Sequence, residues 1–258
     1  MLLAIDIGNT QTVLGIFRGK KIIAAHRVLT SSLRTEKNIY SSVRSVFRNA
    51  GLKMGETSEA VIVSVIPRQT RRTLRVLKRR CNIRPMIVSG AVDSGLKLRY
   101  KNPSALGADR LCNAVAAFHM FGGPVIVVDF GTATKYEAIS RRGEYLGGAI
   151  GLGVGSAADG LYTRTAMLPR IKLRFPQHAI GTNTVTAIQS GVVYGALDAM
   201  EGMVKRFKTI TGRRTKVICT GGFSHLVAAY SDIVDRTAPY LVLEGARIIY
   251  EREHPGEN

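Results

Sequence analysis

The chain has 258 residues, of which 45% are hydrophobic and 21% charged, so intrinsic disorder and low complexity are excluded. No apolar run approaches the roughly 20 residues of a membrane-spanning helix, and a strand pattern starts at Leu2 without a basic leader, so we expect a soluble, cytoplasmic protein. The net charge of +19 requires that a polyanionic partner be considered.

The N-terminal half is predicted to begin with a hairpin. Apolar residues at 2–5 and 13–17 flank a glycine-containing turn, and residues 22–28 continue as a third strand. Apolar residues at helical spacing predict a helix over 36–50, and the apolar run at 60–66 predicts a buried strand.

The next predicted helix carries the densest positive charge. Its basic residues recur at spacings of three and four, which places much of the charge on one face: Arg68, Arg71, Arg72, Arg75, Lys78, Arg79 and Arg80. Such a face could neutralise nucleic-acid phosphates or only attract anionic substrates. No aromatic residues interleave with the charges, and no helix-turn-helix or zinc-finger spacing accompanies them. We therefore favour the second interpretation and expect no nucleic-acid partner.

The C-terminal half is predicted to start in the same way as the N-terminal half. An apolar strand at 124–128 ends in an Asp-Phe-Gly turn, and strands at 136–139 and from 145 onward follow. The Asp-x-Gly turns at Asp6 and Asp129 lie nearly half the chain apart, which suggests an internal duplication. The other predicted elements are strands at 85–88 and 216–219, helices at 111–121, 183–207 and 223–231, and a frayed polar tail at 251–258.

Asp6 and Asp129 are candidate ligands for a phosphate and its Mg²⁺. A strand that delivers an aspartate into a glycine turn places a carboxylate beside exposed backbone N–H groups, which suits a metal-bound phosphate. Gly8 and Gly131 would let the backbone approach that phosphate closely. One such turn is more often a plain hairpin turn, but two turns at the heads of two halves predict phosphates held between those halves.

Asp109 is a candidate catalytic residue at the predicted start of a helix. A kinase that phosphorylates a primary alcohol benefits from a carboxylate that orients the hydroxyl and accepts its proton. The structural alternative is a favourable aspartate at a helix N-terminus that pairs with Arg110. Arg110 could instead bind a substrate carboxylate, and Tyr100 could close over a substrate or lie half-buried in the core.

The three cysteines, Cys81, Cys112 and Cys219, are odd in number and far apart, so neither a disulfide framework nor a zinc site is predicted. The five histidines share no spacing and receive no role.

Several ordered motifs resemble those of type III pantothenate kinases, a bacterial family in the superfamily of sugar kinases, actin and heat-shock chaperone ATPases. They are DIGNTQT at 6–12, YKNPSALGADR at 100–110, DFGTAT at 129–134, YLGGAI at 145–150, LPRI at 168–171, NTVTAIQSGVVYG at 183–195 and TGG at 220–222. Together they cover nearly the whole chain, and they are far more specific than one Asp-x-Gly turn.

The resemblance implies an α/β protein with a duplicated ribonuclease-H-like fold. Its two mixed-sheet halves would be residues 1–117 and 118–258, with helices around a central cleft. The implied reaction is ATP-dependent conversion of pantothenate to 4′-phosphopantothenate, the first step of coenzyme A biosynthesis. A homodimer, Mg²⁺ and a monovalent cation such as K⁺ or NH₄⁺ are implied as well.

The resemblance also assigns roles to single residues. ATP would be bound by Asp6, Ile7, Gly8, Asn9, Thr10, Gln11, Thr12, Val13 and Thr132. Asp129 would hold the monovalent cation. Pantothenate would be bound by Tyr100, Gly107, Ala108, Asp109, Arg110 and Thr184, with Asp109 as the proton acceptor. From its position alone, a threonine such as Thr184 near a helix start is usually a cap.

The chain departs from the family pattern after the second turn. The family usually continues DxGTAT with Thr and often has Asp two positions later, where this chain has Lys135 and Glu137. Lys135 could contact phosphate, weaken the need for a monovalent cation, or point to solvent. Residues 151–155, Gly-Leu-Gly-Val-Gly, replace a family Pro-Gly and predict more backbone freedom there. All three aspartates remain, so activity is expected.

Two other functions stay open at this point. One is a catalytically inactive relative that acts as a basic regulatory or nucleic-acid-associated accessory protein, against which the intact Asp109 argues. The other is a phosphatase that acts on a polyphosphate or nucleotide and releases inorganic phosphate without an acceptor alcohol.

Overall fold

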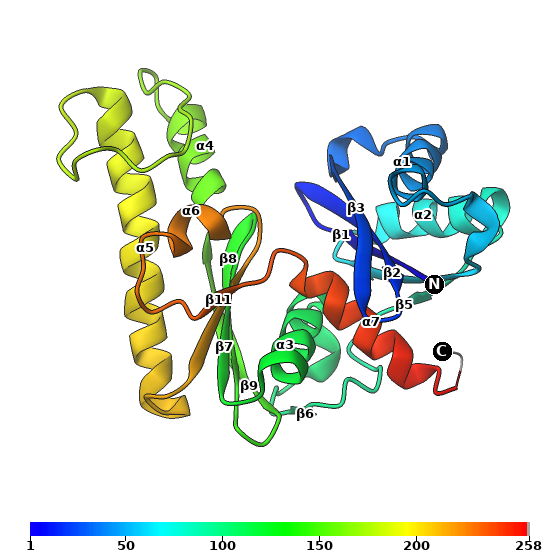
Figure 1. The fold of residues 1–258 in the computed structure, drawn as a ribbon. Coiled ribbons are helices and arrows are strands. Elements are labelled where there is room, and N and C mark those ends of the chain that lie inside the picture. Colours follow the sequence, from blue (N-terminus) through cyan, green and yellow to red (C-terminus); the bar gives the residue numbers. More distant parts are fainter. Residues whose placement is uncertain (257–258) are drawn as a thin grey trace. The chain divides into compact units, whose positions relative to one another are not determined.

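The computed structural model describes residues 1–256 and divides them into two compact units (Figure 1). Unit 1 contains residues 1–96, 101–116 and the described residues from 241 onward, and unit 2 contains residues 97–100 and 117–240. The change of unit near residue 116 lies beside the predicted boundary at 117/118. The C-terminal segment, which the prediction assigns to the second half, groups with unit 1 because its helix packs there.

Unit 1 is built on a mixed five-stranded sheet with the order β3-β2-β1-β4-β5. Its strands are β1 (Leu2–Ile7), β2 (Gln11–Arg18), β3 (Lys21–Leu29), β4 (Glu59–Ser64) and β5 (Arg84–Ile87). The first three strands pair antiparallel, whereas β1, β4 and β5 run parallel. Its helices are α1 (Glu36–Asn49), α2 (Pro67–Arg80) and α7 (Leu241–Glu253). Helix α7 packs on β1 and β4, while α1 and α2 pack against each other.

Helix α1 forms where its sequence pattern predicts it. The Thr35 hydroxyl accepts a hydrogen bond from the Asn38 N–H at 3.2 Å and caps the helix. One stripe of α1, which includes Val43 and Phe47, is buried in the core with Ile5 and other strand residues. Each such side chain stabilises the fold by about 1.5–3 kcal/mol.

Helix α2 has one apolar stripe and one basic face. Val76 and Leu77 are fully buried, whereas most of its basic residues are exposed. Arg75 pairs with Glu36 of α1 at 3.3 Å, and the Arg80 guanidinium lies 4.5 Å from the ring centroid of Tyr40. The predicted basic face is therefore confirmed as a solvent-exposed surface of unit 1.

Unit 2 is built on a six-stranded mixed sheet with the order β11-β10-β7-β8-β9-β6. The strands are β6 (Lys97–Leu98), β7 (Val125–Phe130), β8 (Ala133–Ile139), β9 (Glu144–Leu152), β10 (Lys216–Thr220) and β11 (Arg236–Thr237). β7, β8 and β9 pair antiparallel, and β10 and β11 run parallel to β7.

The two sheets share the order and directions of five strands, as the predicted duplication requires, with β7 in the place of β1. Asp6 and Asp129 are each the fifth residue of their strand.

The remaining helices are α3 (Ala108–Phe121), α4 (Val154–Arg164), α5 (Thr184–Thr211) and α6 (Ser224–Ala228). The long helix α5 packs on β7 and β8, with α4 beside it (Figure 1). Helices α4 and α7 were not predicted from the sequence, and the predicted frayed tail is wrong for residues 251–253, which belong to α7. Residues 257 and 258 of that predicted tail lie outside the described residues. No helix within residues 1–256 is both long and apolar enough to cross a membrane.

Candidate functional site

The first Asp-x-Gly turn is held in one shape by hydrogen bonds. The Gly8 N–H donates to the Gln11 carbonyl at 3.0 Å, and the Thr30 hydroxyl donates to the Gly8 carbonyl at 2.7 Å. A Cβ at position 8 would lie 2.9 Å from the Gln11 oxygen, so glycine is required there. Asn9 and Thr10 are exposed at the tip of the turn. The turn therefore presents backbone and side-chain polar groups in a fixed arrangement.

Several of the predicted ATP-binding residues of this turn have buried side chains. Ile7, Thr12 and Val13 are buried, so their side chains belong to the core and only their backbone remains for a ligand. The Thr12 hydroxyl is hydrogen-bonded to Thr30 at 2.9 Å. Thr30, which was not among the predicted site residues, thus orders the turn through these two side-chain contacts and through its N–H, which donates to the Thr10 carbonyl at 2.9 Å.

Asp109 lies in the first turn of α3, as predicted. Its Oδ1 accepts the Arg110 N–H at 2.9 Å, and the Leu111 N–H donates to the Gly107 carbonyl at 3.0 Å. A Cβ at Gly107 would lie 2.7 Å from the Asp109 Oδ1, so the glycine leaves room for the carboxylate. Arg110 is only 7% exposed, which contradicts the surface-pair alternative for that residue. Ala108 is buried at the start of the helix.

Asp6 and Asp109 lie in one neighbourhood of unit 1. Burial raises the pKa of the Cys112 thiol well above its ordinary value of 9.0, and the negative charges of Asp6 and Asp109 raise it further. Both carboxylates must therefore lie close enough to Cys112 to act on it through space. Two of the three predicted acidic residues therefore lie near the same buried thiol, although they are about a hundred positions apart in the sequence.

We expect all three thiols to react slowly in the folded protein. Burial raises the pKa of Cys81 to about 11 and that of Cys219 to about 12, and Cys112 is affected in the same direction. A pKa of about 11 leaves roughly one thiolate in a thousand at pH 8, and the thiolate is the reactive form. Ellman's reagent should titrate no thiol rapidly in the native protein and three after unfolding in urea. Rapid titration of the native protein would contradict the buried positions.

The second turn brings Asp129 and Lys135 together in unit 2. The antiparallel register of β7 and β8 places the two residues opposite each other. The Lys135 Nζ lies 2.8 Å from the Asp129 Oδ2, and the side chains are only 16% and 9% exposed. Of the three outcomes left open for Lys135, the structure excludes a side chain that points freely into solvent.

Close packing of glycines fixes the same turn. A Cβ at Gly221, whose φ is +90°, would lie 2.5 Å from the Asp129 Oδ1. A Cβ at Gly153 would overlap the Thr132 carbonyl, which also accepts the Ser156 hydroxyl at 2.7 Å. Glycine is therefore required at positions 153 and 221, because a larger residue would collide with the second turn. The Thr132 side chain itself is exposed.

A second polar group is buried farther along β8. Glu137 is fully buried, and its carboxylate accepts a hydrogen bond from the Tyr145 hydroxyl. Tyr100 packs edge-on against Tyr145 with 6.0 Å between ring centroids. The sequence did not predict this pair, because Glu137 is one of two charged residues in β8 and nothing local marks it as the buried one.

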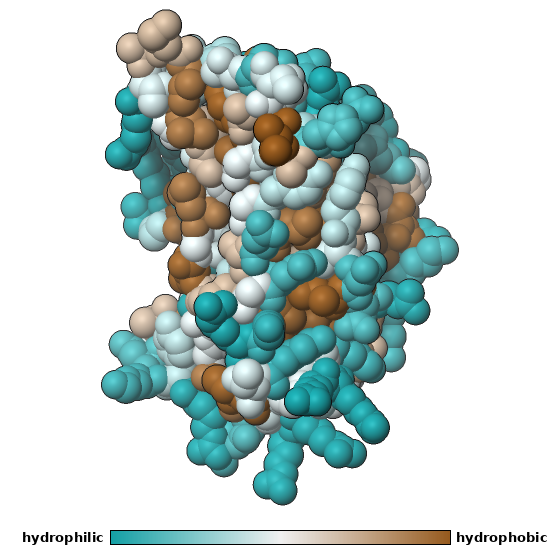
Figure 2. All heavy atoms as spheres, turned by 90° about the vertical axis from the view of Figure 1, so that its left-hand side faces the viewer, coloured by the Kyte–Doolittle hydropathy of each residue, from teal (hydrophilic) through white to brown (hydrophobic). Residues whose placement is uncertain are grey.

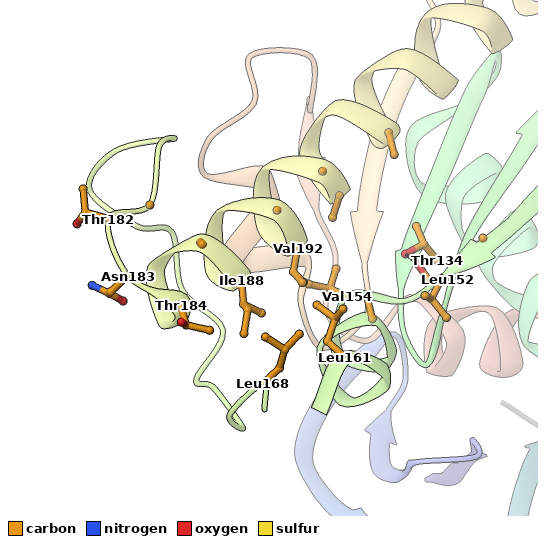
Figure 3. Close-up of a pocket in the computed structure, with 18 of the residues that line it drawn as sticks. Thr134, Leu152, Val154, Leu161, Leu168, Thr182, Asn183, Thr184, Ile188 and Val192 are labelled. Carbon is orange, nitrogen blue, oxygen red and sulfur yellow. Dashed lines mark hydrogen bonds between the residues drawn. The ribbon is translucent and has the colours of Figure 1, made fainter. Parts of the chain in front are cut away.

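Thr184 lies at the rim of an apolar cavity of about 930 Å³ in unit 2. The cap of α5 is Asn183, whose side chain accepts the Thr186 N–H at 3.0 Å, so Thr184 is not the cap that its position suggested. In Figure 3, Ile188 and Val192 of α5 are directed toward α4, which contributes Leu161 to the wall.

The surface around this cavity is unusually apolar. Leu152 and Leu161, which both line the cavity, are exposed large apolar residues, and Leu152 is 71% exposed. Figure 2 shows several apolar patches on the side of the molecule where α4 and α5 lie in Figure 1. An exposed apolar surface of this kind is typical of a binding face.

Comparison with known proteins gives one consistent family. The model of the type III pantothenate kinase family matches residues 2–206. A type III pantothenate kinase from Moorella thermoacetica is 42% identical over 252 residues, which is 98% of this chain and 99% of that protein.

Solved structures share the fold at low identity. Component A of (R)-2-hydroxyglutaryl-CoA dehydratase from Acidaminococcus fermentans aligns with a TM-score of 0.59 at 16% identity and covers 96% of both chains. A candidate N-acetylglucosamine kinase from Chromobacterium violaceum aligns with a TM-score of 0.51 at 14% identity, over 96% of this chain and 98% of its own. The predicted fold class, that of actin and the sugar kinases, is thereby confirmed.

Proposed function

The chain belongs to the type III pantothenate kinase family, and from this membership we infer that it transfers the terminal phosphoryl group of ATP to pantothenate, the first step of coenzyme A biosynthesis. Within the structure, the observation that supports this function best is the closeness of Asp6 and Asp109 to the same buried thiol. We assign the Asp6 carboxylate to the nucleotide and the Asp109 carboxylate to the acceptor alcohol.

We propose that Asp109 is the proton acceptor. It stands in the first turn of α3, at the positive end of the helix dipole. One carboxylate oxygen is held by the Arg110 N–H, so the side chain has a fixed direction. A carboxylate fixed in this way can orient the pantothenate hydroxyl and take its proton as the bond to phosphorus forms. Gly107, Ala108, Arg110, Tyr100 and Thr184 remain proposed pantothenate residues.

We propose that the first turn binds the phosphates of ATP, with Thr132 as a further ATP residue. Asp6 precedes this turn, and Asn9 and Thr10 are exposed at its tip. Their oxygens are hard ligands of the kind that Mg²⁺ takes, one or two carboxylates together with substrate phosphates. When bound, Mg²⁺ would neutralise charge on the phosphate oxygens. The glycine turn would add its backbone N–H groups to the same phosphates.

A coupled assay tests this function against the alternatives. With ATP and Mg²⁺ present, we expect ADP to form only when pantothenate is added, in equal amount to 4′-phosphopantothenate. Release of inorganic phosphate in the absence of any alcohol would favour a phosphatase. Absence of both reactions, together with salt-sensitive binding to DNA, would favour the inactive accessory protein.

We propose that the apolar surface around the cavity binds a second copy of the chain. The homodimer is implied by the family resemblance, and the exposed apolar side chains of Leu152 and Leu161 support this use of the surface. A homodimer with two-fold symmetry would bury them against the same surface patch of the partner.

The variant Leu152→Asp tests the proposed dimer, because it places a charge in the middle of the apolar surface. We expect the dissociation constant to rise by roughly 30-fold or more, the scale of a central interface residue. Ile210→Asp is the matched control, since Ile210 is 78% exposed but does not line the cavity. Analytical ultracentrifugation measures both variants, and an unmutated protein that is monomeric at high concentration would refute the proposed interface.

We also propose that the positive charge attracts the anionic substrates rather than a nucleic acid. ATP and pantothenate are both anions, and a net charge of +19 raises their local concentration and their association rates. The proposal includes a cytoplasmic location, where ATP is available.

A further inference from the structure

We propose that the ammonium group of Lys135 takes the place of the monovalent cation at Asp129, so that this chain works without K⁺ or NH₄⁺. The inference rests on the proposed role of the 129–134 turn in phosphoryl transfer. It differs from the requirement that the family resemblance implies, and it concerns a residue in which this chain departs from the family pattern.

The residues around Asp129 do not fit an additional cation. The Asp129 Oδ2 is 2.8 Å from the Lys135 Nζ, and its Oδ1 lies against the backbone of Gly221. Asp129 as a whole is only 6% exposed. The next carboxylate on β8, that of Glu137, accepts the Tyr145 hydroxyl. Within residues 1–256, no group of three or more His, Cys, Asp or Glu side chains is suited to a metal ion.

The ammonium group also supplies the charge that a cation would bring. Asp129 and Lys135 together are neutral, whereas Asp129 with a smaller residue opposite it would attract a positive ion. A monovalent cation bound about 4 Å from the ammonium group would be repelled by it. At an effective dielectric constant of 20, this repulsion would weaken the binding of the cation roughly 1,000-fold relative to a site with the carboxylate alone. The Lys135 ammonium group therefore both occupies the site beside Asp129 and repels a monovalent cation that would bind there.

The strand register makes this arrangement specific to position 135. Residues 129 and 135 face each other across β7 and β8, so their side chains leave the same side of the sheet. The neighbours Thr134 and Tyr136 leave the other side, where Tyr136 is part of the core beneath α5. A lysine one residue earlier or later would not reach Asp129.

The experiment compares turnover in KCl with turnover in choline chloride at equal ionic strength. We expect the unmutated enzyme to differ by less than about twofold between the two salts. Lys135→Thr, which restores the residue typical of the family, should lose roughly 100-fold in choline chloride, the scale of one lost electrostatic group, and recover most of the loss in KCl. Lys135→Arg should retain independence from K⁺.

A second measurement does not depend on activity. The midpoint of thermal unfolding should rise in KCl relative to choline chloride for Lys135→Thr, because a bound ion stabilises the folded state. The unmutated protein and the control Lys205→Thr, whose lysine is exposed on α5, should show no such rise. Should Lys135→Thr fail to fold, the unmutated protein alone decides.

The proposal is refuted if the unmutated enzyme turns over pantothenate in KCl but is inert in choline chloride, or if KCl specifically stabilises it. Absence of turnover in KCl would contradict the kinase function itself, whereas turnover that requires KCl would contradict only the role proposed for Lys135.

Discussion

Replacing Asp109 by Asn is expected to lower kcat by roughly 10²–10⁴-fold, the range for loss of a general base. The amide has the shape of the carboxylate, and its oxygen can still accept the Arg110 N–H that now lies 2.9 Å away. The helix start should therefore be preserved, while the group that takes the proton of the alcohol is lost. A rate measurement at saturating ATP and pantothenate, with circular dichroism to confirm the fold, checks this result.

Asp93→Asn is the matched control for this variant. Asp93 also belongs to unit 1, accepts a backbone N–H from Gly95 at 3.0 Å and pairs with Arg252 at 2.8 Å, but its side chain is 65% exposed. We expect kcat of this control to stay within about twofold, since an exposed ion pair contributes little. Full activity of Asp109→Asn would show that another group accepts the proton.

Gly245→Ala is expected to destabilise the protein by about 3 kcal/mol, the upper end for overpacking a core. Gly245 lies in the middle of α7, and a Cβ there would lie 2.6 Å from the Cys112 Cα. The obstacle is backbone, so rotation of a side chain cannot relieve it. The gain of about 0.5–1 kcal/mol for alanine in a helix offsets only part of the cost.

The control for this effect is Gly160→Ala in α4. A Cβ at position 160 would meet no atom within 4 Å, so only the helix-propensity gain remains. We expect this variant to be more stable by about 0.5–1 kcal/mol. Urea unfolding followed by circular dichroism measures both variants, and a Gly245→Ala protein as stable as the unmutated one would be incompatible with the packing of α7 on α3.

The hairpins could be predicted from the sequence because their signals are local. In both halves, apolar runs flank a glycine turn, and the observed strands β1, β2 and β3 extend the predicted ones by only a few residues. Helix α1 is similarly local, since its cap and its apolar stripe lie within one segment. Asp109 could be located for the same reason, as the glycine before it marks the start of α3.

Helices α4 and α7 could not be predicted because their signals are not local. Helix α4 is rich in small residues, and Gly153, which precedes it, is required by the Thr132 carbonyl of another segment. Helix α7 contains a central glycine and a buried arginine, Arg247. Two glutamates of the same helix, Glu244 and Glu251, hold that arginine, and its guanidinium lies over Phe17. A buried charge and a mid-helix glycine both argue against a core helix until the partners are known.

Lys135 shows the same limit within the candidate site. Its sequence position allowed three outcomes, and only the register of β7 and β8 selects the contact with Asp129. The neighbourhood of Asp6 and Asp109 also depends on packing between distant segments, so the sequence could identify the two residues but not bring them together.

The position of α7 has a consequence for how the protein is made. Unit 1 contains the earliest segments of the chain, yet α7, which packs on β1 and β4, begins only at Leu241. During translation the first sheet therefore leaves the ribosome well before the helix that covers part of it. The apolar face that α7 covers therefore stays exposed, or bound to a chaperone, until almost the entire polypeptide has been synthesised.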